Sequence, residues 1–516
     1  MTILKIDSKV ADYLGVAVLL EALGIRDEDA ERYGFKDRFA LAKRLMEVIE
    51  YYRGRGEVVG AEETSLPDRM EDAAKLYIQG ILTSSPWLFT TLGMIITGVS
   101  LWPARDIGLD FVTVVGLANL LSLVASALIY QVFLRRVLFY FYQEMYGLMI
   151  KVLDLYFMFG LGLTALGAFV IVFPAVLGLY GSENLILLSI YFSAFTPLWV
   201  AVAPLYAFRK YVSLALIFLL IVAVNNLVVF FLGGFRVLQP ATFGIYLISV
   251  SAIVFLYTYL SLRLEGVKMT MSRPRGSMEA KASLPGLSFI ILPGIPYGIG
   301  GALYFILLFT DRLVVWSGGL CPRLLVDPLY EAGANLSLLI LVPVLGSLNY
   351  TMISMYREIV EGGERLMAKD MEAYRRIIRR SYWRAVAYNV AVGLAALIFL
   401  YAVLSQYSGA TIFDIVTVGS NLLFILLVEG GGNLLLIIFL MNSLLFNYLY
   451  RPWLTIYSAL PAVITNLVLG SVLVRTLGVE YACIGYITGM SIAALVSTYI
   501  ASNIIRRIDY AYYTAF

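Results

Sequence analysis

Residues 287–316 read LSFIILPGIPYGIGGALYFILLFTDRLVVW, and this stretch sets the class of the fold. It carries no charge before the pair Asp311 and Arg312, and an apolar helix of about 20 residues is long enough to cross a bilayer. Its first half contains Pro293, Pro296 and four glycines, which bend helices and let backbones approach closely. We therefore expect a membrane helix that is interrupted near its start and charged near its end.

The composition places the rest of the chain in the membrane as well. Of its 516 residues, 60% are hydrophobic and 14% are charged, whereas soluble proteins carry about 25% charged and 45–50% apolar residues. The apolar runs are continuous instead of alternating, so they predict helices and not strands. We expect an all-α integral membrane protein with about twelve membrane helices. Their expected spans are 79–102, 111–134, 152–180, 184–207, 211–233, 241–262, 287–310, 331–355, 384–405, 429–449, 452–474 and 481–504.

The long polar segments divide the chain into four parts. Residues 1–78 are expected to form a small cytoplasmic helical region, and 79–262 the first six-helix lobe. Residues 263–286 read as a basic cytoplasmic linker, and 287–516 as the second six-helix lobe. Alternate connections between the helices carry most of the Lys and Arg residues, and such short loops stay in the cytoplasm. The expected location is the plasma membrane, with both termini on the cytoplasmic side.

Two helices at equivalent positions of the two lobes look interrupted. The first helix of the first lobe opens with SSPWL, and the first helix of the second lobe opens with the Pro- and Gly-rich segment quoted above. Paired interruptions of this kind indicate a transport pathway, although Pro and Gly are also common in ordinary membrane helices. The residues expected along the pathway are Pro86, Trp87, Pro293, Pro296, Tyr297 and Tyr304.

Several asparagines lie inside apolar spans, and three of them are considered for the pathway. Asn225 and Asn226 are adjacent in the middle of one span, and Asn349 lies in a later one. A side-chain amide that faces lipid is costly, so each of them either bonds to a neighbouring helix or faces a cavity on the pathway. The sequence leaves both alternatives open.

The charged pair at the end of the quoted run has two interpretations. Asp311 lies far enough along its helix to reach the outer edge of the bilayer. In the first interpretation the pair is an interfacial anchor, with Arg312 extended toward the headgroups. In the second, Asp311, Arg312 and Trp316 form an outer gate, in which Asp311 holds Arg312 or a residue of the opposing lobe. Glu429 is likewise expected near the outer end of its helix.

Several classes of function are disfavoured by what the sequence lacks. It contains no histidine, which is the commonest general base and metal ligand. It contains no GxxxxGK[ST] loop, so the chain does not resemble the ATPase of a primary pump. The two cysteines, Cys321 and Cys483, form no metal-ligand motif. We therefore expect no enzymatic activity, no metal, no cofactor and no nucleic-acid partner.

Several motifs, in order along the chain, resemble the PelG family of Pel-type exopolysaccharide exporters. They are SSPWLFTTL, ALYFILLFTDRLVVW, DPLYE, NYLY, YACIGY and the terminal DYAYYTAF. The resemblance covers residues 79–516. The chain departs from the family in its longer first 78 residues, in SGG after Trp316, and in Arg312 where the family often has Lys. The resemblance implies the fold of the multidrug/oligosaccharidyl-lipid/polysaccharide (MOP) flippase superfamily: two lobes around a central cavity, alternating access, and a polysaccharide synthase as neighbour.

Three functions follow from these observations. The leading hypothesis is export or flipping of a polysaccharide or lipid-linked saccharide from cytoplasm to exterior. The second is a MATE-like small-molecule exporter driven by protons or sodium, which needs a buried carboxylate that the first lobe scarcely offers. The third is a non-transporting scaffold that uses residues 1–78 to dock a cytoplasmic synthase. Membrane lipids are expected partners, because the basic cluster from Arg375 to Arg384 suits anionic headgroups.

Overall fold

The computed structural model consists of two compact units, Met1–Lys75 and Leu76–Phe516, and the second unit contains both predicted lobes. Secondary structure is described for residues 13, 16–17, 20, 27–32, 34–54, 66–101, 108–177, 182–231, 239–272, 286–318, 324–366, 371–409, 411–412 and 416–513. In the first unit, α3 (Asp27–Arg32) and α4 (Arg38–Gly54) share a small apolar core. Leu20, Leu41 and Met46 are buried in it, and Arg38 pairs with Asp27 at 3.1 Å. The described part of this unit is mostly helical.

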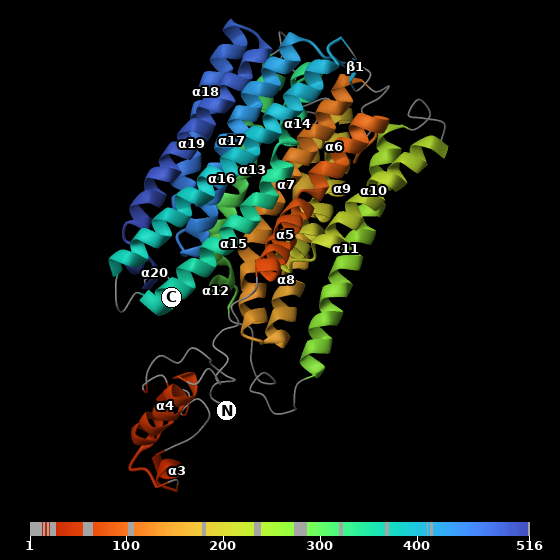
Figure 1. The fold of residues 1–516 in the computed structure, drawn as a ribbon. Coiled ribbons are helices and arrows are strands. Elements are labelled where there is room, and N and C mark those ends of the chain that lie inside the picture. The colour runs from red at the N-terminus through yellow and green to blue at the C-terminus, as the bar shows by residue number, and fades with distance from the viewer. Residues whose placement is uncertain are drawn as a thin grey trace. The chain divides into compact units, whose positions relative to one another are not determined.

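The second unit is built from long apolar helices (Figure 1). Eleven helices of the described chain are long and apolar enough to cross a membrane, or twelve if the bent pair α5–α6 is one span. This confirms the predicted membrane fold. The helices of the first half are α5 (Leu66–Thr83), α6 (Ser85–Thr97), α7 (Leu109–Tyr142), α8 (Tyr146–Val176), α9 (Ser182–Ala207), α10 (Tyr211–Phe231) and α11 (Pro240–Met271).

The second half begins with the segment quoted above, which forms a short α12 (Leu287–Ile291), a 3-10 turn η2 (Leu292–Gly294) and α13 (Ile295–Ser317). The segment continues as one span, Leu287–Ser317, and the interruption predicted from its prolines and glycines is a local 3-10 turn. The helices that follow are α14 (Pro328–Leu338), α15 (Leu341–Leu366), α16 (Met371–Gln406), α17 (Ser420–Tyr448), α18 (Trp453–Thr476), the 3-10 turn η3 (Val479–Tyr481), α19 (Ala482–Ile505) and α20 (Ile508–Tyr513). The described strands are two-residue pieces, β1 (Thr411–Ile412) and β2 (Val416–Thr417), paired antiparallel.

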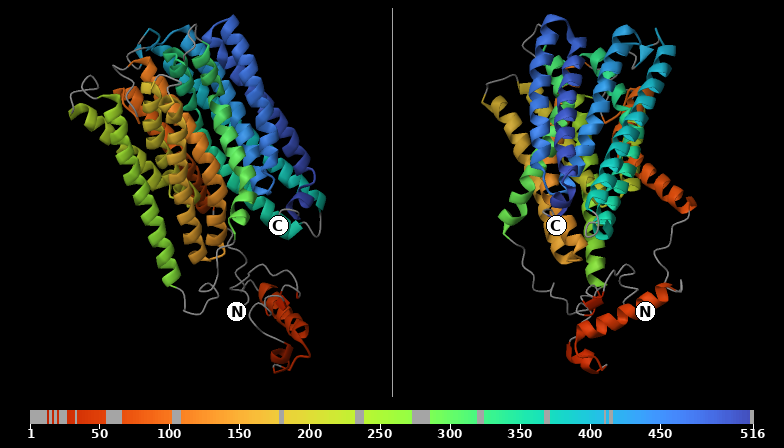
Figure 2. Two further views of the ribbon diagram at one scale, coloured as in Figure 1. Left: turned by 180° about the vertical axis from the view of Figure 1, so that it is seen from behind. Right: turned by 60° about the vertical axis from the view of Figure 1, so that its left-hand side comes forward.

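The helices pack mainly within their own lobe. Helix α9 packs on α7, α8 and α11 in the first lobe, while α19 packs on α17 and α18 in the second. Helices α7 and α13 make the most extensive contact between the lobes. Figures 1 and 2 show the orange to yellow-green helices of the first lobe on one side and the green to blue helices of the second on the other. The seam along α7 and α13 is therefore the main contact between the two lobes.

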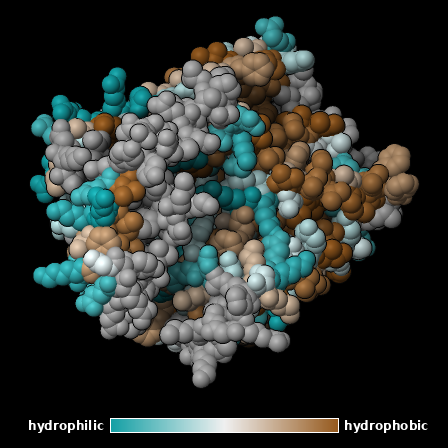
Figure 3. All heavy atoms as spheres, turned by 60° about the horizontal axis from the view of Figure 1, so that its bottom comes forward, coloured by the Kyte–Doolittle hydropathy of each residue, from teal (hydrophilic) through white to brown (hydrophobic). Residues whose placement is uncertain are grey.

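The outer surface of the bundles is apolar. Large hydrophobic side chains are exposed on the outer helices, among them Leu166, Phe169, Phe230, Ile253 and Leu256. Exposed apolar area of this extent is unfavourable in water but suits contact with acyl chains. Hydrophobic side chains also dominate the right-hand side of the space-filling view in Figure 3. The surface supports the assignment as a multi-pass membrane protein.

The two halves of the first membrane helix pack on different lobes. Helices α5 and α6 meet at Ser84 with a bend of 57°. Helix α5 approaches α15 of the second lobe, where Asn349 Nδ2 donates to Leu76 O at 2.7 Å. Helix α6 instead packs on α10 of the first lobe, with Gly93 against Val222. The bent pair α5–α6 therefore links the lobes. The side chain of Asn349 forms a hydrogen bond between α15 and α5.

A glycine allows the contact between α5 and α15. A Cβ added at Gly80 would lie against the carbonyl oxygen of Leu345 and 2.6 Å from Cα of Gly346, so the backbones themselves would have to separate. We expect Gly80→Ala to destabilise the protein by about 1–3 kcal/mol, the usual cost of overpacking a tight interface. The measurement is the midpoint of thermal unfolding in detergent. Gly162→Ala in α8 is the matched control, because a Cβ there meets no atom within 4 Å; equal midpoints for the two variants would contradict this prediction.

Candidate functional site

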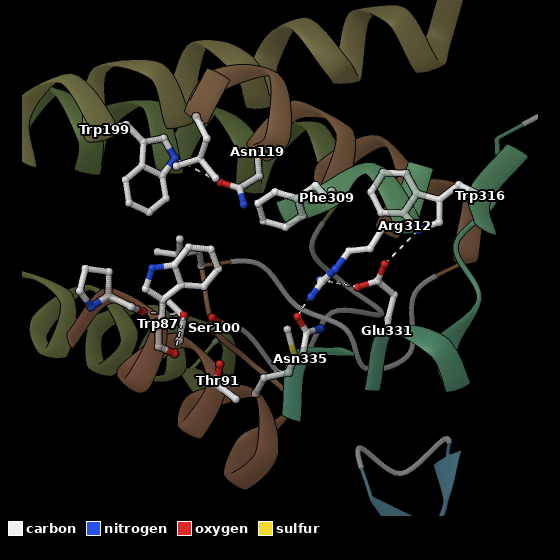
Figure 4. A pocket seen from close by; sticks show the side chains of 16 residues that line it. Trp87, Thr91, Ser100, Asn119, Trp199, Phe309, Arg312, Trp316, Glu331 and Asn335 are labelled. Atoms are coloured by element: carbon white, nitrogen blue, oxygen red, sulfur yellow. Dashed lines mark hydrogen bonds and ion pairs between the residues drawn. The ribbon is translucent and has the colours of Figure 1, made fainter. Parts of the chain in front are cut away.

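A cavity of about 120 Å³ lies between the lobes, and we call it the central pocket (Figure 4). Helices α6, α7 and α9 line it from the first lobe, and α13 and α14 line it from the second. The lining residues are Pro86, Trp87, Thr90, Thr91, Met94, Ser100, Leu101, Gly116, Asn119, Leu123, Trp199, Phe309, Arg312, Trp316, Glu331 and Asn335. A site lined by both lobes must change shape when the lobes move against each other.

Aromatic rings form one part of the pocket wall. Trp87 of α6 stacks on Phe309 of α13 across the seam, with ring centroids 6.2 Å apart and planes inclined by 25°. Trp199 of α9 donates through Nε1 to Asn119 Oδ1 at 3.2 Å, which fixes both side chains at the pocket wall. Figure 4 shows the two tryptophans and Asn119 around the same space. The wall therefore offers flat apolar faces next to an amide.

A closed polar group forms the opposite part of the wall. Arg312 Nη1 donates to Glu331 Oε2 at 2.9 Å and to Asn335 Oδ1 at 2.8 Å. Trp316 Nε1 donates to Glu331 Oε1 at 2.9 Å, so both carboxylate oxygens are engaged. Among the described residues, the pocket lining thus contains one cation and one anion, which pair with each other. Its net charge is balanced, and Arg312 is held by neighbours instead of extending to solvent.

Asp311 points away from Arg312, because consecutive residues of a helix lie about 100° apart. It is buried within the second lobe beside Glu429 of α17, with exposures of 1% and 3%. The hydroxyl oxygen of Tyr330 lies 2.9 Å from Asp311 Oδ2 and 2.6 Å from Glu429 Oε1. We call Asp311 and Glu429 the acid pair.

The contacts of the acid pair fit one shared proton. A tyrosine hydroxyl has one hydrogen, so Tyr330 can donate to only one of the two carboxylates. A protonated carboxyl group that donates to the hydroxyl oxygen accounts for the second short contact. Burial favours the same state, since two neighbouring carboxylates cannot both be charged in a water-poor interior without a large cost. The arrangement can therefore take up and release one proton.

The structure corrects the sequence-based interpretation of these charges. Asp311 and Arg312 are 1% and 6% exposed, so the interfacial anchor with an extended arginine is wrong. Asp311 does not hold Arg312 or the opposing lobe either; its partner is Tyr330 of its own lobe. Glu429 was expected near a helix end, but α17 begins at Ser420 and buries it. The error arose because depth was counted along single helices, and packing covers these side chains with other helices.

Trp316 is the member of the expected outer gate that faces the other lobe. Its ring packs close to Gly116 of α7, where an added Cβ would lie 3.1 Å from Cη2. Whether this contact opens during a cycle stays a prediction. Trp316 therefore bridges the seam, while its indole nitrogen remains bonded to Glu331.

The other predicted pathway residues are divided between two places. Pro86 and Trp87 line the central pocket, as expected of a pathway. Pro293, Pro296 and Tyr297 instead line a second cavity at the other end of α13, described below. Tyr304 lies between the two cavities and packs in the apolar cluster that also contains Leu307 and Phe309. The paired interruptions thus do not meet at one site.

The asparagines of α10 support the pocket without lining it. Asn225 Nδ2 donates to Ser100 O at 2.9 Å, and its Oδ1 accepts from the Tyr246 hydroxyl at 3.0 Å. Asn226 Nδ2 donates to Val99 O at 3.4 Å and to Val222 O at 2.8 Å. Of the two open alternatives, bonding to a neighbouring segment is the one observed. Both amides hold the loop that follows α6.

Removal of the Asn225 amide should loosen that loop. Asn225→Ala leaves the buried Tyr246 hydroxyl and the Ser100 carbonyl without partners, which costs about 1–3 kcal/mol per orphaned group. We expect a lower thermal unfolding midpoint in detergent. Asn226→Ala should have the smaller effect, because its contact to the loop is long and its shorter bond stays within α10. An equal or larger loss for Asn226→Ala would show that Asn225 does not hold the loop.

Sequence reasoning missed six residues of the site: Asn119, Trp199, Tyr330, Glu331, Asn335 and Glu429. Asn119 carried a usable signal, since it is an amide inside an apolar span like Asn225. Tyr330 and Glu331 entered the sequence analysis only as part of the motif DPLYE, at the start of the predicted span 331–355. They belong to α14, which starts at Pro328 with the Asp327 side chain accepting from the Tyr330 amide at 2.8 Å.

Comparison with known proteins identifies the fold. No protein-family model matches the chain, and no curated protein matches it in sequence. A crystal structure of MATE in complex with MaD3S is 16% identical, covers 85% of this chain and 96% of its own, and has a TM-score of 0.55. An outward-facing multidrug resistance MATE family transporter of the MOP superfamily has the same identity, coverage and TM-score.

A MOP superfamily transporter from Pyrococcus furiosus is also similar. It is 16% identical over 84% of this chain and 95% of its own, with a TM-score of 0.54, and is described as having a pocket of reverse polarity that suggests a different function. The chain has the MATE/MOP transporter fold. The two-lobe fold expected from the resemblance is that of these structures, while membership of the PelG family stays a prediction.

Proposed function

We propose that this MATE/MOP-fold chain is a membrane transporter that moves a saccharide, as polysaccharide or lipid-linked saccharide, from cytoplasm to exterior by alternating access. The observation that carries the proposal is the central pocket, which both lobes line with aromatic rings, amides and a neutralised ion pair. Structures of the same fold are described in inward-facing and outward-facing conformations, which supports movement of the lobes in this chain as well.

The chemistry of the pocket suits a polyhydroxylated passenger. The faces of Trp87 and Trp199 can stack on the apolar faces of sugar rings, and Asn119, Asn335 and Thr91 can pair with hydroxyl groups. A cationic drug would need an unpaired anion, but Glu331 is already bonded by Arg312 and Trp316. The balanced charge therefore favours a neutral saccharide over a cationic small molecule.

The size of the pocket implies that the lobes separate during transport. A space of about 120 Å³ is below the several hundred Å³ of ordinary ligand sites. A saccharide of more than one ring requires a wider opening along the seam of α7 and α13. Trp316 against Gly116 and Trp87 against Phe309 are the contacts that must part for this to occur.

The acid pair supports one part of the proposal, the coupling of transport to the movement of protons. A proton-driven exporter needs a buried carboxyl group that gains and loses a proton. The sequence of the first lobe contains few candidate carboxyl groups. The second lobe supplies two, Asp311 and Glu429, joined through Tyr330. Asp311 is adjacent in sequence to the pocket residue Arg312, so a change in its charge acts directly on α13. We include proton coupling through this pair in the proposed mechanism.

The finer features of the function are supported only by the resemblance and by charge. These are the PelG-type passenger, a synthase as partner, the docking role of residues 1–78, and the plasma membrane with both termini in the cytoplasm. The basic connections support the orientation. A MATE-like exporter of small molecules is the second candidate, favoured by the same acid pair and disfavoured by the balanced charge of the pocket.

Transport by the purified protein tests the proposal. The protein is reconstituted into vesicles with a pH gradient, and the passage of fluorescent oligosaccharides, a glycolipid and a cationic dye is followed. We expect gradient-dependent movement of a saccharide and little movement of the dye. Movement of the dye alone would favour the small-molecule exporter. Movement of no compound, with the protein intact in the vesicles, would favour the scaffold.

A further inference from the structure

We infer that the second cavity is a binding site for the phosphate group of a lipid, and that its occupant is a lipid-linked passenger at the start of transport. This inference rests on the proposed saccharide transport and narrows it, because a free polysaccharide carries no such phosphate. The cavity measures about 490 Å³ and lies at the end of the seam that the basic connections predict to face the cytoplasm. We call it the seam cavity.

Both lobes build the seam cavity. Residues of α7 line it from the first lobe, and the α12–α13 segment and the turn before α18 line it from the second. The two helices touch tightly above it, since a Cβ added at Gly298 would lie 2.7 Å from the carbonyl oxygen of Leu128. The Pro- and Gly-rich segment that indicated a pathway in the sequence therefore forms a wall of this cavity. A ligand bound here contacts both lobes at once.

Two neighbouring arginines, Arg135 and Arg136, line the seam cavity. No carboxylate of the described residues lies within 4.0 Å of Arg135 or Arg136, whereas Arg375 on the same predicted side is paired with Asp509 at 2.8 Å. Arg135 and Arg136 are only half-buried, so their charges remain accessible from the cavity. Two neighbouring cations without an internal counter-ion favour an anion as the occupant.

Arg135 is held by aromatic rings and by one side-chain hydrogen bond to Tyr450, and it keeps its other donors. Its guanidinium lies 3.5 Å from the ring centroid of Tyr297 and 5.2 Å from that of Tyr450, both on the second lobe. Stacking uses the flat face of the guanidinium, while its N–H groups point outward in the plane and form a fork that matches phosphate. Arg136 donates one N–H group to Phe289 O at 2.8 Å, and its other N–H groups remain available. The pair can therefore chelate one phosphate or a diphosphate.

The rim of the seam cavity indicates that the phosphate belongs to a lipid. Phe139, Leu292 and Trp453 line the cavity and are all exposed. An exposed apolar rim is unfavourable beside a water-soluble anion such as a nucleotide or inorganic phosphate. It suits an acyl or isoprenyl chain, and an exposed tryptophan is typical of the bilayer interface. The combination of arginine fork and apolar rim fits a chain that ends in a phosphate.

Binding to the full-length protein in detergent tests this inference. The probe is farnesyl diphosphate, an isoprenyl chain that ends in a diphosphate. Farnesol has the chain alone, inorganic pyrophosphate has the anion alone, and dioleoylphosphatidylglycerol represents the phosphate of bulk membrane lipid. Native mass spectrometry and ligand-dependent shifts of the unfolding midpoint report binding. We expect farnesyl diphosphate to bind about tenfold or more tightly than each of the other three, because only it uses both the fork and the rim.

The variants separate binding from folding. Arg135→Gln and Arg136→Gln should each weaken farnesyl diphosphate binding about tenfold. Arg135→Lys should give an intermediate loss, since it keeps the charge but not the planar fork. Arg475→Gln is the matched control, an exposed arginine in the last turn of α18 outside the cavity, and should bind as the parent does. A variant whose unfolding midpoint without ligand falls is replaced by the lysine variant at that position.

Each outcome bears on the inference. Equal binding of farnesol, or unchanged binding by both glutamine variants, overturns it. Equal binding of phosphatidylglycerol also overturns it, because the cavity would then hold bulk phospholipid. Free oligosaccharide transport without farnesyl diphosphate binding overturns this inference and leaves the proposed function standing. Binding that depends on Arg135, in a protein that moves no saccharide, supports the phosphate site and removes the proposed function.

Discussion

Asp311→Asn is expected to abolish the dependence of transport on a pH gradient while leaving the protein folded. The substituted amide keeps the shape of the carboxyl group and can still bond to Tyr330, but it can neither bind nor release a proton. Coupling between two sites is typically worth 5- to 150-fold in affinity, and we expect about that loss in the stimulation by the gradient. The measurement is saccharide uptake into vesicles with and without the gradient.

Glu429→Gln provides an internal check on the same prediction. The two carboxyl groups share one hydroxyl partner and act as a unit, so each single variant should lose nearly the full effect. The double variant should then be little worse than either one. Asp110→Asn is the matched control, because this acid lies exposed in the first turn of α7. Unaltered gradient dependence in both Asp311→Asn and Glu429→Gln would remove the acid pair from the mechanism.

Trp87→Ala should cause the largest loss of passenger binding. The indole is the ring of α6 that faces the pocket, and it stacks on Phe309 of the opposite lobe. Removing a tryptophan from the centre of a binding site costs about 2 kcal/mol or more, which corresponds to about a 30-fold higher KM for the saccharide. Trp87→Phe should keep part of the stacking surface and lose less. The readout is the concentration dependence of saccharide uptake.

Two comparisons give this prediction its controls. Trp383→Ala removes an exposed tryptophan of α16 that does not line the pocket, and its KM should match that of the parent protein. The response to the pH gradient should persist in Trp87→Ala, because the acid pair lies inside the second lobe. A saccharide KM that stays at the parent value in Trp87→Ala would place the passenger outside the central pocket and count against the proposed site.

The seam cavity and the central pocket lie at different points along α13. Tyr297 lines the first, Phe309 and Arg312 line the second, and Tyr304 lies between them. In the proposed transport, a lipid-linked passenger meets the arginines first and the tryptophans afterwards. The start of residues 287–316 therefore lines the first site and the end lines the second. This explains why one helix combines prolines, glycines and a charged pair.

The sequence by itself determined that the chain forms apolar membrane helices and about how many there are. Continuous apolar runs and unequal loop charge are local properties, and a helix that crosses lipid must satisfy its own backbone. The 3-10 turn before α13 was equally local, because Pro293 and Gly294 change the backbone wherever they occur. Pro86 and Trp87 were recognised for the same reason, as part of an interrupted helix start.

Only the tertiary structure decided what the polar side chains do. Asp311 and Arg312 are adjacent in sequence, yet one bonds inside the second lobe to Tyr330 and the other lines the pocket beside Glu331. Glu429 joins Asp311 from a helix far along the chain. Such partners are set by how each helix is rotated and which neighbour covers it. That rotation results from side-chain packing among several helices, and the sequence of a single helix does not contain it.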